Sequence, residues 1–189
     1  MRDDTIHMPE AAEELDIELA ERLEPYAEAP PVKAFSVFGK LSDQEPLLAM
    51  AGAAIIAGVV QRNSCLARRG AHVYGAVVLA TVMKAGLKAV VARDRPTELL
   101  EHGRHEVRLG HTDDKARQSF PSGHAAGAIA AATATNRCWP QYRVPAYAAA
   151  ALMCVSRLPA QKHYLTDILA GGLVGLVASA VVERIMPSE

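Results

Sequence analysis

The chain has 189 residues, a length typical of one domain, and carries 20 Lys/Arg against 21 Asp/Glu. Hydrophobic residues make up 50% of it and aromatic residues only 5%, and with arginines scattered along the body this disfavours a nucleic-acid-binding protein. Three cysteines without CxxC spacing disfavour a disulfide framework or a zinc site.

The charge divides the chain into two parts. Residues 1–46 carry four Lys/Arg against twelve Asp/Glu, whereas residues 47–189 carry sixteen against nine. We therefore expect an acidic head, formed by an amphipathic helix and a linker, followed by a basic and apolar body that is embedded in a membrane.

The head is predicted to begin with a helix that starts at Pro9. Apolar residues fall along one face of this helix and acidic residues along the other; the apolar ones are Ala12, Leu15, Leu19 and Leu23. An anionic lipid surface would repel the acidic face. We expect the helix to dock on its own body or on a second subunit, which leaves a homo-oligomer open. The segment EAPPVK, residues 28–33, is typical of a stiff linker.

Five apolar runs dominate the body, and because strict alternation is missing from them, helices are favoured over strands. The runs are Leu47–Val60, Ala71–Ala92, Ser122–Thr135, Val144–Val155 and Tyr164–Val182. A soluble bundle of Ala-rich helices is the alternative, but five such runs would leave a soluble fold little polar surface. We predict an all-α integral membrane bundle of about five transmembrane helices.

Two motifs lie between the apolar runs. In KAVVARDRP, Lys88 and Arg95 are about two helical turns apart, so both cations fall on one face near the end of a helix. In SFPSGHA, the sequence around Ser122 marks a helix start, and Gly123 lets the backbone approach a ligand closely. The free N–H groups of such a helix start favour an anion, and His124 lies beside them.

A third motif, SRLPAQKHYLTD, precedes the last apolar run. It brings Arg157, and it sets His163 and Asp167 four residues apart on one helical face. Guanidinium groups and exposed amides match phosphate oxygens. One histidine backed by a carboxylate is a candidate nucleophile, and the other could protonate a leaving oxygen. The three motifs together indicate phosphoryl transfer without a metal ion.

With these motifs the chain resembles the type-2 phosphatidic acid phosphatase superfamily, whose pattern is K-x6-R-P, then P-S-G-H, then S-R-x5-H-x3-D. All specified positions occur in order: Lys88, Arg95, Pro96, Pro121, Ser122, Gly123, His124, Ser156, Arg157, His163 and Asp167. The resemblance covers residues 88–167 directly. The membrane branch of this family usually has six transmembrane helices, whereas five runs are visible here, and the acidic head stands where a first span would be expected.

The resemblance implies a role for each motif residue. His163 would be the nucleophile that forms a phosphohistidine, Asp167 would orient its ring, and His124 would be the general acid that later activates water. The phosphoryl oxygens would be held by Lys88, Arg95, Ser122, Gly123 and Arg157. No metal ion and no other cofactor is expected.

The resulting hypothesis is a membrane phosphatase that acts on a lipid phosphate or diphosphate. Phosphatidic acid, phosphatidylglycerol phosphate, undecaprenyl diphosphate and a lipid A phosphate all fit as substrates. One alternative is a vanadium-dependent haloperoxidase or soluble acid phosphatase of the same superfamily. Another is a non-catalytic membrane protein with a degenerate site.

Residues 97–120 are predicted to form the only long polar loop of the body. Some of its residues resemble metal ligands loosely, but their irregular spacing favours a solvated cap: His102, His105, His111, Asp113 and Asp114. Lys84, one turn before Lys88, would favour phosphate but could equally extend to the membrane interface.

The arginines also bear on the orientation of the chain in a bacterial-type inner membrane. The ends of the runs opposite the motifs carry Arg62, Arg68, Arg69, Arg137, Arg143 and Arg184. The motif side carries, besides Arg95 and Arg157, the cations Arg93, Arg104, Arg108, Lys115, Arg117 and Lys162. The first set is denser and lies in shorter loops, so the positive-inside rule predicts that the site faces away from the cytoplasm.

Overall fold

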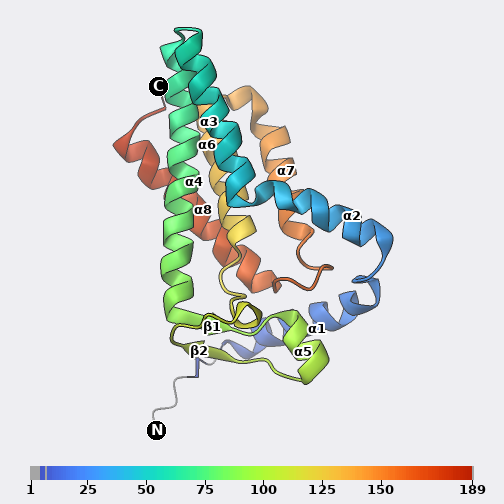
Figure 1. Ribbon diagram of the computed structural model, residues 1–189. Coiled ribbons are helices and arrows are strands. Elements are labelled where there is room, and N and C mark those ends of the chain that lie inside the picture. Colours follow the sequence, from blue (N-terminus) through green and yellow to red (C-terminus); the bar gives the residue numbers. More distant parts are fainter. Residues whose placement is uncertain (1–4, 7, 189) are drawn as a thin grey trace.

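The computed structural model describes residues 5, 6 and 8–188 of the chain, and its main feature is a bundle of five helices (Figure 1). These are α3 (Gln44–Val60), α4 (Ser64–Val90), α6 (Gly123–Cys138), α7 (Arg143–Val155) and α8 (Leu165–Ile185). Each contains most of one predicted apolar run, so the prediction of an all-α body is confirmed. Helix α4 begins before its apolar run because the Asn63 side chain caps it, accepting a hydrogen bond from the Leu66 N–H at 3.0 Å.

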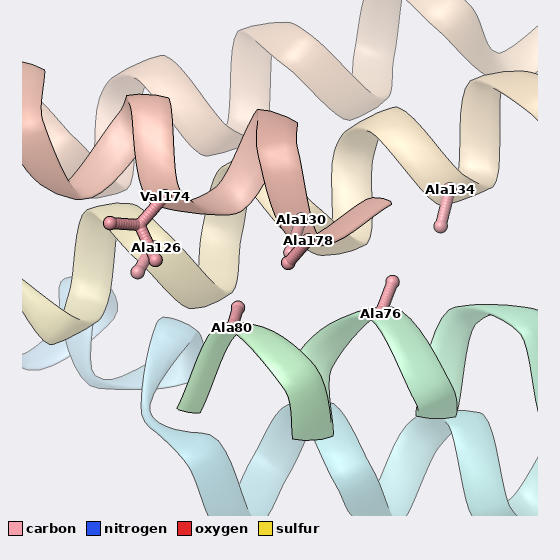
Figure 2. Packing of buried hydrophobic residues seen from close by; sticks show 7 residues of the cluster. All are labelled: Ala76, Ala80, Ala126, Ala130, Ala134, Val174 and Ala178. Atoms are coloured by element: carbon pink, nitrogen blue, oxygen red, sulfur yellow. The ribbon is translucent and has the colours of Figure 1, made fainter. Parts of the chain in front are cut away.

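Small residues hold the centre of the bundle together. Helices α4, α6 and α8 meet in a cluster of buried side chains (Figure 2): Ala76, Ala80, Ala126, Ala130, Ala134, Val174 and Ala178. Two glycines of α8 allow its backbone to pack closely against α6. A Cβ on Gly171 would lie 2.3 Å from the Ser122 carbonyl oxygen, and a Cβ on Gly175 would lie 2.5 Å from the Ala126 carbonyl oxygen. The first turns of α6 and α8 therefore lie in direct backbone contact, with the Ser122 N–H bonded to the Asp167 carbonyl at 3.0 Å.

Among the described residues, two helices, α4 and α8, are long and apolar enough to cross a membrane. A third span results if helix α2 (Pro30–Gly39) and α3, which meet at 49°, are counted as one broken span. Helices α6 and α7 have 16 and 13 residues, and at the usual helical rise they reach only about 24 and 20 Å. The outer faces of α4 and α8 expose apolar residues such as Val82 and Leu169, which suits lipid. The number of five transmembrane helices stays a prediction.

The head forms helix α1 (Glu10–Leu23), which starts directly after Pro9 as predicted. It lies beside helix α5 (Pro96–His102) at the end of the bundle where α8 begins (Figure 1). The prediction of its buried face was wrong in one respect: Leu15 is 44% exposed, whereas Asp16 and Ala20 are buried. The helix docks on its own body, and a second subunit stays a prediction.

The predicted linker at residues 28–33 was wrong, because α2 begins at Pro30. Proline is well suited to the first positions of a helix, where its missing N–H would have no partner in any case. Short 3-10 turns precede and follow this region: η1 (Glu24–Tyr26) and η2 (Lys40–Ser42).

The predicted polar loop is more regular than expected. Strands β1 (Val91–Arg93) and β2 (Val107–Leu109) pair antiparallel, with Ala92 opposite Arg108, and α5 lies between them in the chain. The 3-10 turns η3 (Lys115–Arg117) and η4 (Pro140–Tyr142) complete the elements. Three-residue strands leave no periodicity that the sequence could show. The hairpin covers the lower end of the bundle in Figure 1, beneath the first turn of α6.

Candidate active site

The three sequence motifs converge at one end of the bundle, where they line a cavity of about 310 Å³. Five of the eight predicted site residues lie in its wall: Lys88, Arg95, Gly123, His124 and His163. Lys88 comes from the last turn of α4, and Arg95 stands directly before α5 with the extended backbone expected of a residue that precedes proline. The predicted helix start at Ser122 is confirmed, since Ser122 caps α6.

His163 lies at the inner wall of this cavity and is almost fully buried. Its Nδ1 is 2.8 Å from the Ser119 carbonyl oxygen, which can only accept, so Nδ1 carries the proton and donates it. The lone pair of the neutral ring is therefore on Nε2. Burial lowers the pKa of His163, which keeps the ring neutral to lower pH than usual. A neutral, oriented imidazole of this kind is suited to nucleophilic attack.

Asp167 is fully buried behind His163, but it does not bond the ring directly. Its Oδ2 is 3.9 Å from His163 Nδ1, which is within ion-pair range and too long for a hydrogen bond. Instead, Oδ2 accepts from the Ser119 hydroxyl at 2.6 Å and from the Tyr164 N–H at 2.9 Å. Ser119 thus links the two residues, since its carbonyl accepts from the histidine and its hydroxyl donates to the aspartate.

His124 has a carboxylate partner of its own. Its Nε2 lies 2.6 Å from Oδ1 of Asp43, at the start of α3, and its ring centroid is 6.1 Å from that of His163. Burial raises the pKa of Asp43, while nearby Arg157 opposes this rise. Asp43 was not singled out from the sequence, because it lies in the acidic head, far from the motifs along the chain.

The remaining predicted phosphate-binding residues, Arg157 and Ser122, do not line the cavity. Arg157 is buried against α2, where it donates to the Ser36 carbonyl at 3.0 Å and occupies the space left by the missing side chain of Gly39. Ser122 is buried as the cap of α6. Burial lowers the pKa values of both Arg95 and Arg157.

Two further lysines take part in the cavity wall. Lys84 passes over the first residue of α6, so that a Cβ on Gly123 would lie 2.9 Å from its Cδ. Lys115, from the polar loop, also lines the cavity. Lys88 donates to the Gln118 carbonyl, which ties the loop to α4. Four cations, two histidines and a helix N-terminus therefore surround one space, and this arrangement can bind a phosphoryl group and attack it.

The sequence model of the PAP2 superfamily matches residues 69–189 of the chain, and these include every motif residue. The chain belongs to the PAP2 superfamily. This match confirms the family that the three motifs indicated. It leaves out residues 1–68, which include the acidic head.

Proteins similar to this PAP2 chain include two named lipid A 1-phosphatase. One, from Rhizobium etli, is 32% identical over 121 residues, which are 61% of this chain and 51% of that protein. The other, from Rhizobium johnstonii, is 32% identical over 104 residues, 54% of this chain and 41% of that protein. The chain thus spans about half of the length of the relatives it matches.

Two crystal structures share the fold. LpxE of Aquifex aeolicus superposes with a TM-score of 0.66 at 21% identity, over 97% of this chain and 99% of that one. The first transmembrane PAP2-type phosphatidylglycerolphosphate phosphatase, from Bacillus subtilis, gives 0.62 at 19% identity, over 94% and 87%. The bundle is therefore that of a transmembrane PAP2 protein, which confirms the predicted membrane fold. Coverage of 97% also means that nearly all of the head belongs to the shared fold.

Proposed function

We propose that this protein removes a phosphate group from a membrane lipid and that a phosphohistidine is the intermediate. The observation that carries the proposal is the position of His163 and His124 in the wall of one cationic cavity, at the end of a bundle with apolar outer faces. A lipid could rest its chains along these faces while its phosphate enters the cavity.

The geometry supports a two-step displacement. Nε2 of His163 attacks phosphorus, an N–P bond forms, and the P–O bond to the lipid breaks as His124 protonates the leaving oxygen. His124 then takes a proton from water, whose oxygen attacks the phosphohistidine, and phosphate leaves with the N–P electron pair returned to His163.

Fixed charges stabilise this reaction. The cations of the wall, with the N–H groups at the start of α6, are directed at the phosphoryl oxygens where negative charge gathers. Arg157, which lies beside the wall, would support the same charge from behind or turn toward the phosphate when it binds. The Ser119 carbonyl holds the proton of Nδ1, and the charge of Asp167, 3.9 Å from Nδ1, stabilises the positive ring of the intermediate.

The substrate that we propose is a lipid A 1-phosphate or a lipid phosphate of similar size. The names of the relatives favour it, and they concern proteins at least 31% identical to the matched parts of this chain. Phosphatidic acid, phosphatidylglycerol phosphate and undecaprenyl diphosphate are the comparisons that test the choice.

Purified protein in detergent should release phosphate from at least one of these four lipids, fastest from the lipid A phosphate, and it should do so in excess EDTA. The cations of the wall supply the charge that a metal would otherwise bring. Released phosphate is measured for each lipid, with His163→Ala as the background. Absence of release from all four lipids would contradict the phosphatase; loss in EDTA with recovery in magnesium would contradict the metal-free mechanism.

We further propose that the cavity faces away from the cytoplasm. Two of the cations on the motif side are not free to face the membrane interface. Arg93 is buried between two carboxylates, and Lys115 lines the cavity. This leaves the opposite end with the larger number of interfacial arginines.

A cysteine in the polar loop should react with an impermeant thiol reagent in spheroplasts. Asp113 is suited to this change because its side chain is 97% exposed. The matched control is already present, since Cys65 is exposed near the start of α4 at the other end of the bundle. Two variants are compared: one with Asp113→Cys as its single cysteine, and one with Cys65 alone. Labelling of Cys65 before lysis, and of position 113 only after it, would reverse the orientation.

A further inference from the structure

We propose that helix α1 is part of the catalytic apparatus, with Asp16 acting as a positioning residue that fixes Asp167 through the buried guanidinium of Arg93. The inference rests on the proposed phosphatase function and concerns how its nucleophile is held. Arg93 lies within the first motif, but at a position that the pattern K-x6-R-P leaves unspecified. Asp16 lies outside the residues that the family model matches.

The contacts form a continuous chain from the head to the nucleophile. Arg93 Nη2 donates to Asp16 Oδ2 at 2.8 Å, and Arg93 Nη1 donates to Asp167 Oδ1 at 2.8 Å. The exposed fractions of Asp16, Arg93 and Asp167 are 1%, 1% and 0%. Two carboxylates from helices far apart in the sequence therefore share one guanidinium in the interior of the protein.

The orientation of the Arg93 guanidinium is fixed by contacts at its two terminal nitrogens and over its face. The two carboxylates hold its two terminal nitrogens, and the ring of Tyr164 lies over its face, 4.3 Å from the Arg93 Cζ. Thr166 closes the arrangement, because it donates from its N–H and its hydroxyl to Asp16 and accepts from Arg93 Nη1 at 2.7 Å. A planar fork held at both ends has one orientation, so the carboxylate it grips also has one.

Charge balance gives Asp16 a second effect. A buried guanidinium with a single carboxylate partner would draw that partner into a tight ion pair. With Asp16 present, the positive charge of Arg93 is shared between two carboxylates. The negative charge of Asp167 is then less fully compensated by Arg93, and it interacts more strongly with Ser119 and His163. This is the charge that stabilises the positive ring of the phosphohistidine.

Other contacts show that the head supports the whole segment that carries the nucleophile. Gln161, two residues before His163, donates to the Ala20 carbonyl of α1 at 3.0 Å. His105 bridges Glu13 of α1 at 3.1 Å and Arg93 at 3.3 Å. A cavity of only about 10 Å³, lined by both Asp16 and His163, lies between the helix and the nucleophile.

Replacement of Asp16 by asparagine should lower kcat about 10- to 100-fold while KM changes less than about twofold. The inhibition constant of inorganic phosphate should stay within the same twofold, since the cations of the cavity wall are untouched. Glu14→Gln is the matched control: it removes one charge from an exposed position of the same helix and should leave all three constants unchanged. Thermal unfolding in detergent establishes that both variants are folded.

A double variant tests the coupling directly. Arg93→Gln leaves two buried carboxylates facing each other, and kcat should fall more than about 100-fold. Adding Asp16→Asn to it removes the unpaired charge and should restore kcat about tenfold. Should Asp16→Asn not fold, Arg93→Lys carries the test, because lysine keeps the charge but cannot bridge both carboxylates as a fork; kcat should then fall with unchanged KM.

The outcomes separate this inference from the proposed function. Wild-type protein that releases no phosphate contradicts the function itself. Active wild-type protein with unchanged kcat in Asp16→Asn contradicts the positioning role, and so does a loss of activity in which KM and the phosphate inhibition constant rise together with a lower unfolding temperature. That last pattern would mean that α1 only stabilises the fold.

Discussion

His163→Ala should lower phosphate release by more than about 1000-fold, the size of loss seen when a covalent nucleophile is removed. The ring has one proton position defined by Ser119, and its other nitrogen is therefore ready to attack. Of the two histidines that line the cavity, His163 is the more deeply buried, with a side chain 5% exposed against 22% for His124. The measurement is kcat on the preferred lipid, together with acid-labile, base-stable phosphate bound to the protein after rapid quenching.

The control for this experiment is His111→Ala. His111 is 62% exposed in the polar loop, where it contacts Asp113, so its removal tests only the loss of an imidazole from the same end of the molecule. Near-normal turnover by His163→Ala, or bound phosphate that persists in that variant, would assign the nucleophile to another residue.

His124→Ala should lower turnover of a lipid phosphate about 100- to 10,000-fold, the range expected for loss of a general acid. The size should depend on the leaving group. An aryl phosphate, whose phenol leaves without protonation, should still phosphorylate His163 quickly in this variant, whereas a lipid alcohol should not. Because we propose that His124 also activates water, the phosphoenzyme formed from the aryl phosphate should accumulate.

Rapid quenching measures this dependence. Comparison of the first-turnover rates for the two substrates in wild-type and variant protein isolates the protonation step from the hydrolysis step. An equal loss for both substrates would mean that His124 binds phosphate rather than protonating the leaving oxygen. Asp43, which holds Nε2 of His124 in the free protein, would have to release it as substrate enters.

The sequence predicted the residues of the site better than the contacts among them. Lys88, Arg95, His124 and His163 could be found because short motifs at fixed spacings bring them to helix ends, and helix ends of a bundle meet. Arg157 was expected to bind phosphate, and it does not line the cavity, since the sequence could not show that Gly39 of α2 leaves it a separate space.

Residues outside the motifs were missed for a different reason. Asp43 and Asp16 reach the site only because the head folds back over the end of the bundle, and such long-range contacts leave no local pattern. One signal was present in α1: Asp16 lies one turn from both Ala12 and Ala20, so it places a charge within the apolar stripe. A carboxylate at that position indicates a buried partner, which is Arg93.

The boundary at residue 46 divides the chain into an acidic part and a basic, apolar part, but residues on both sides of it contribute to the candidate site. The body contains His124 and His163, yet the carboxylate partner of His124 and one of the two carboxylate partners of Arg93 come from residues before that boundary. Two carboxylates of the head have partners at the site, since Asp16 pairs with Arg93 and Asp43 contacts His124.

The contact between α6 and α8 has a consequence for the spacing of the two histidines. His124 lies in the first turn of α6, and His163 stands just before α8, so their separation depends on how closely the two helix starts approach. That approach is possible because Gly171 and Gly175, which lie against the Ser122 and Ala126 carbonyl oxygens, have no Cβ. The distance between the two proposed catalytic histidines thus depends on two hydrogen atoms in place of methyl groups, at positions of α8 that do not line the cavity.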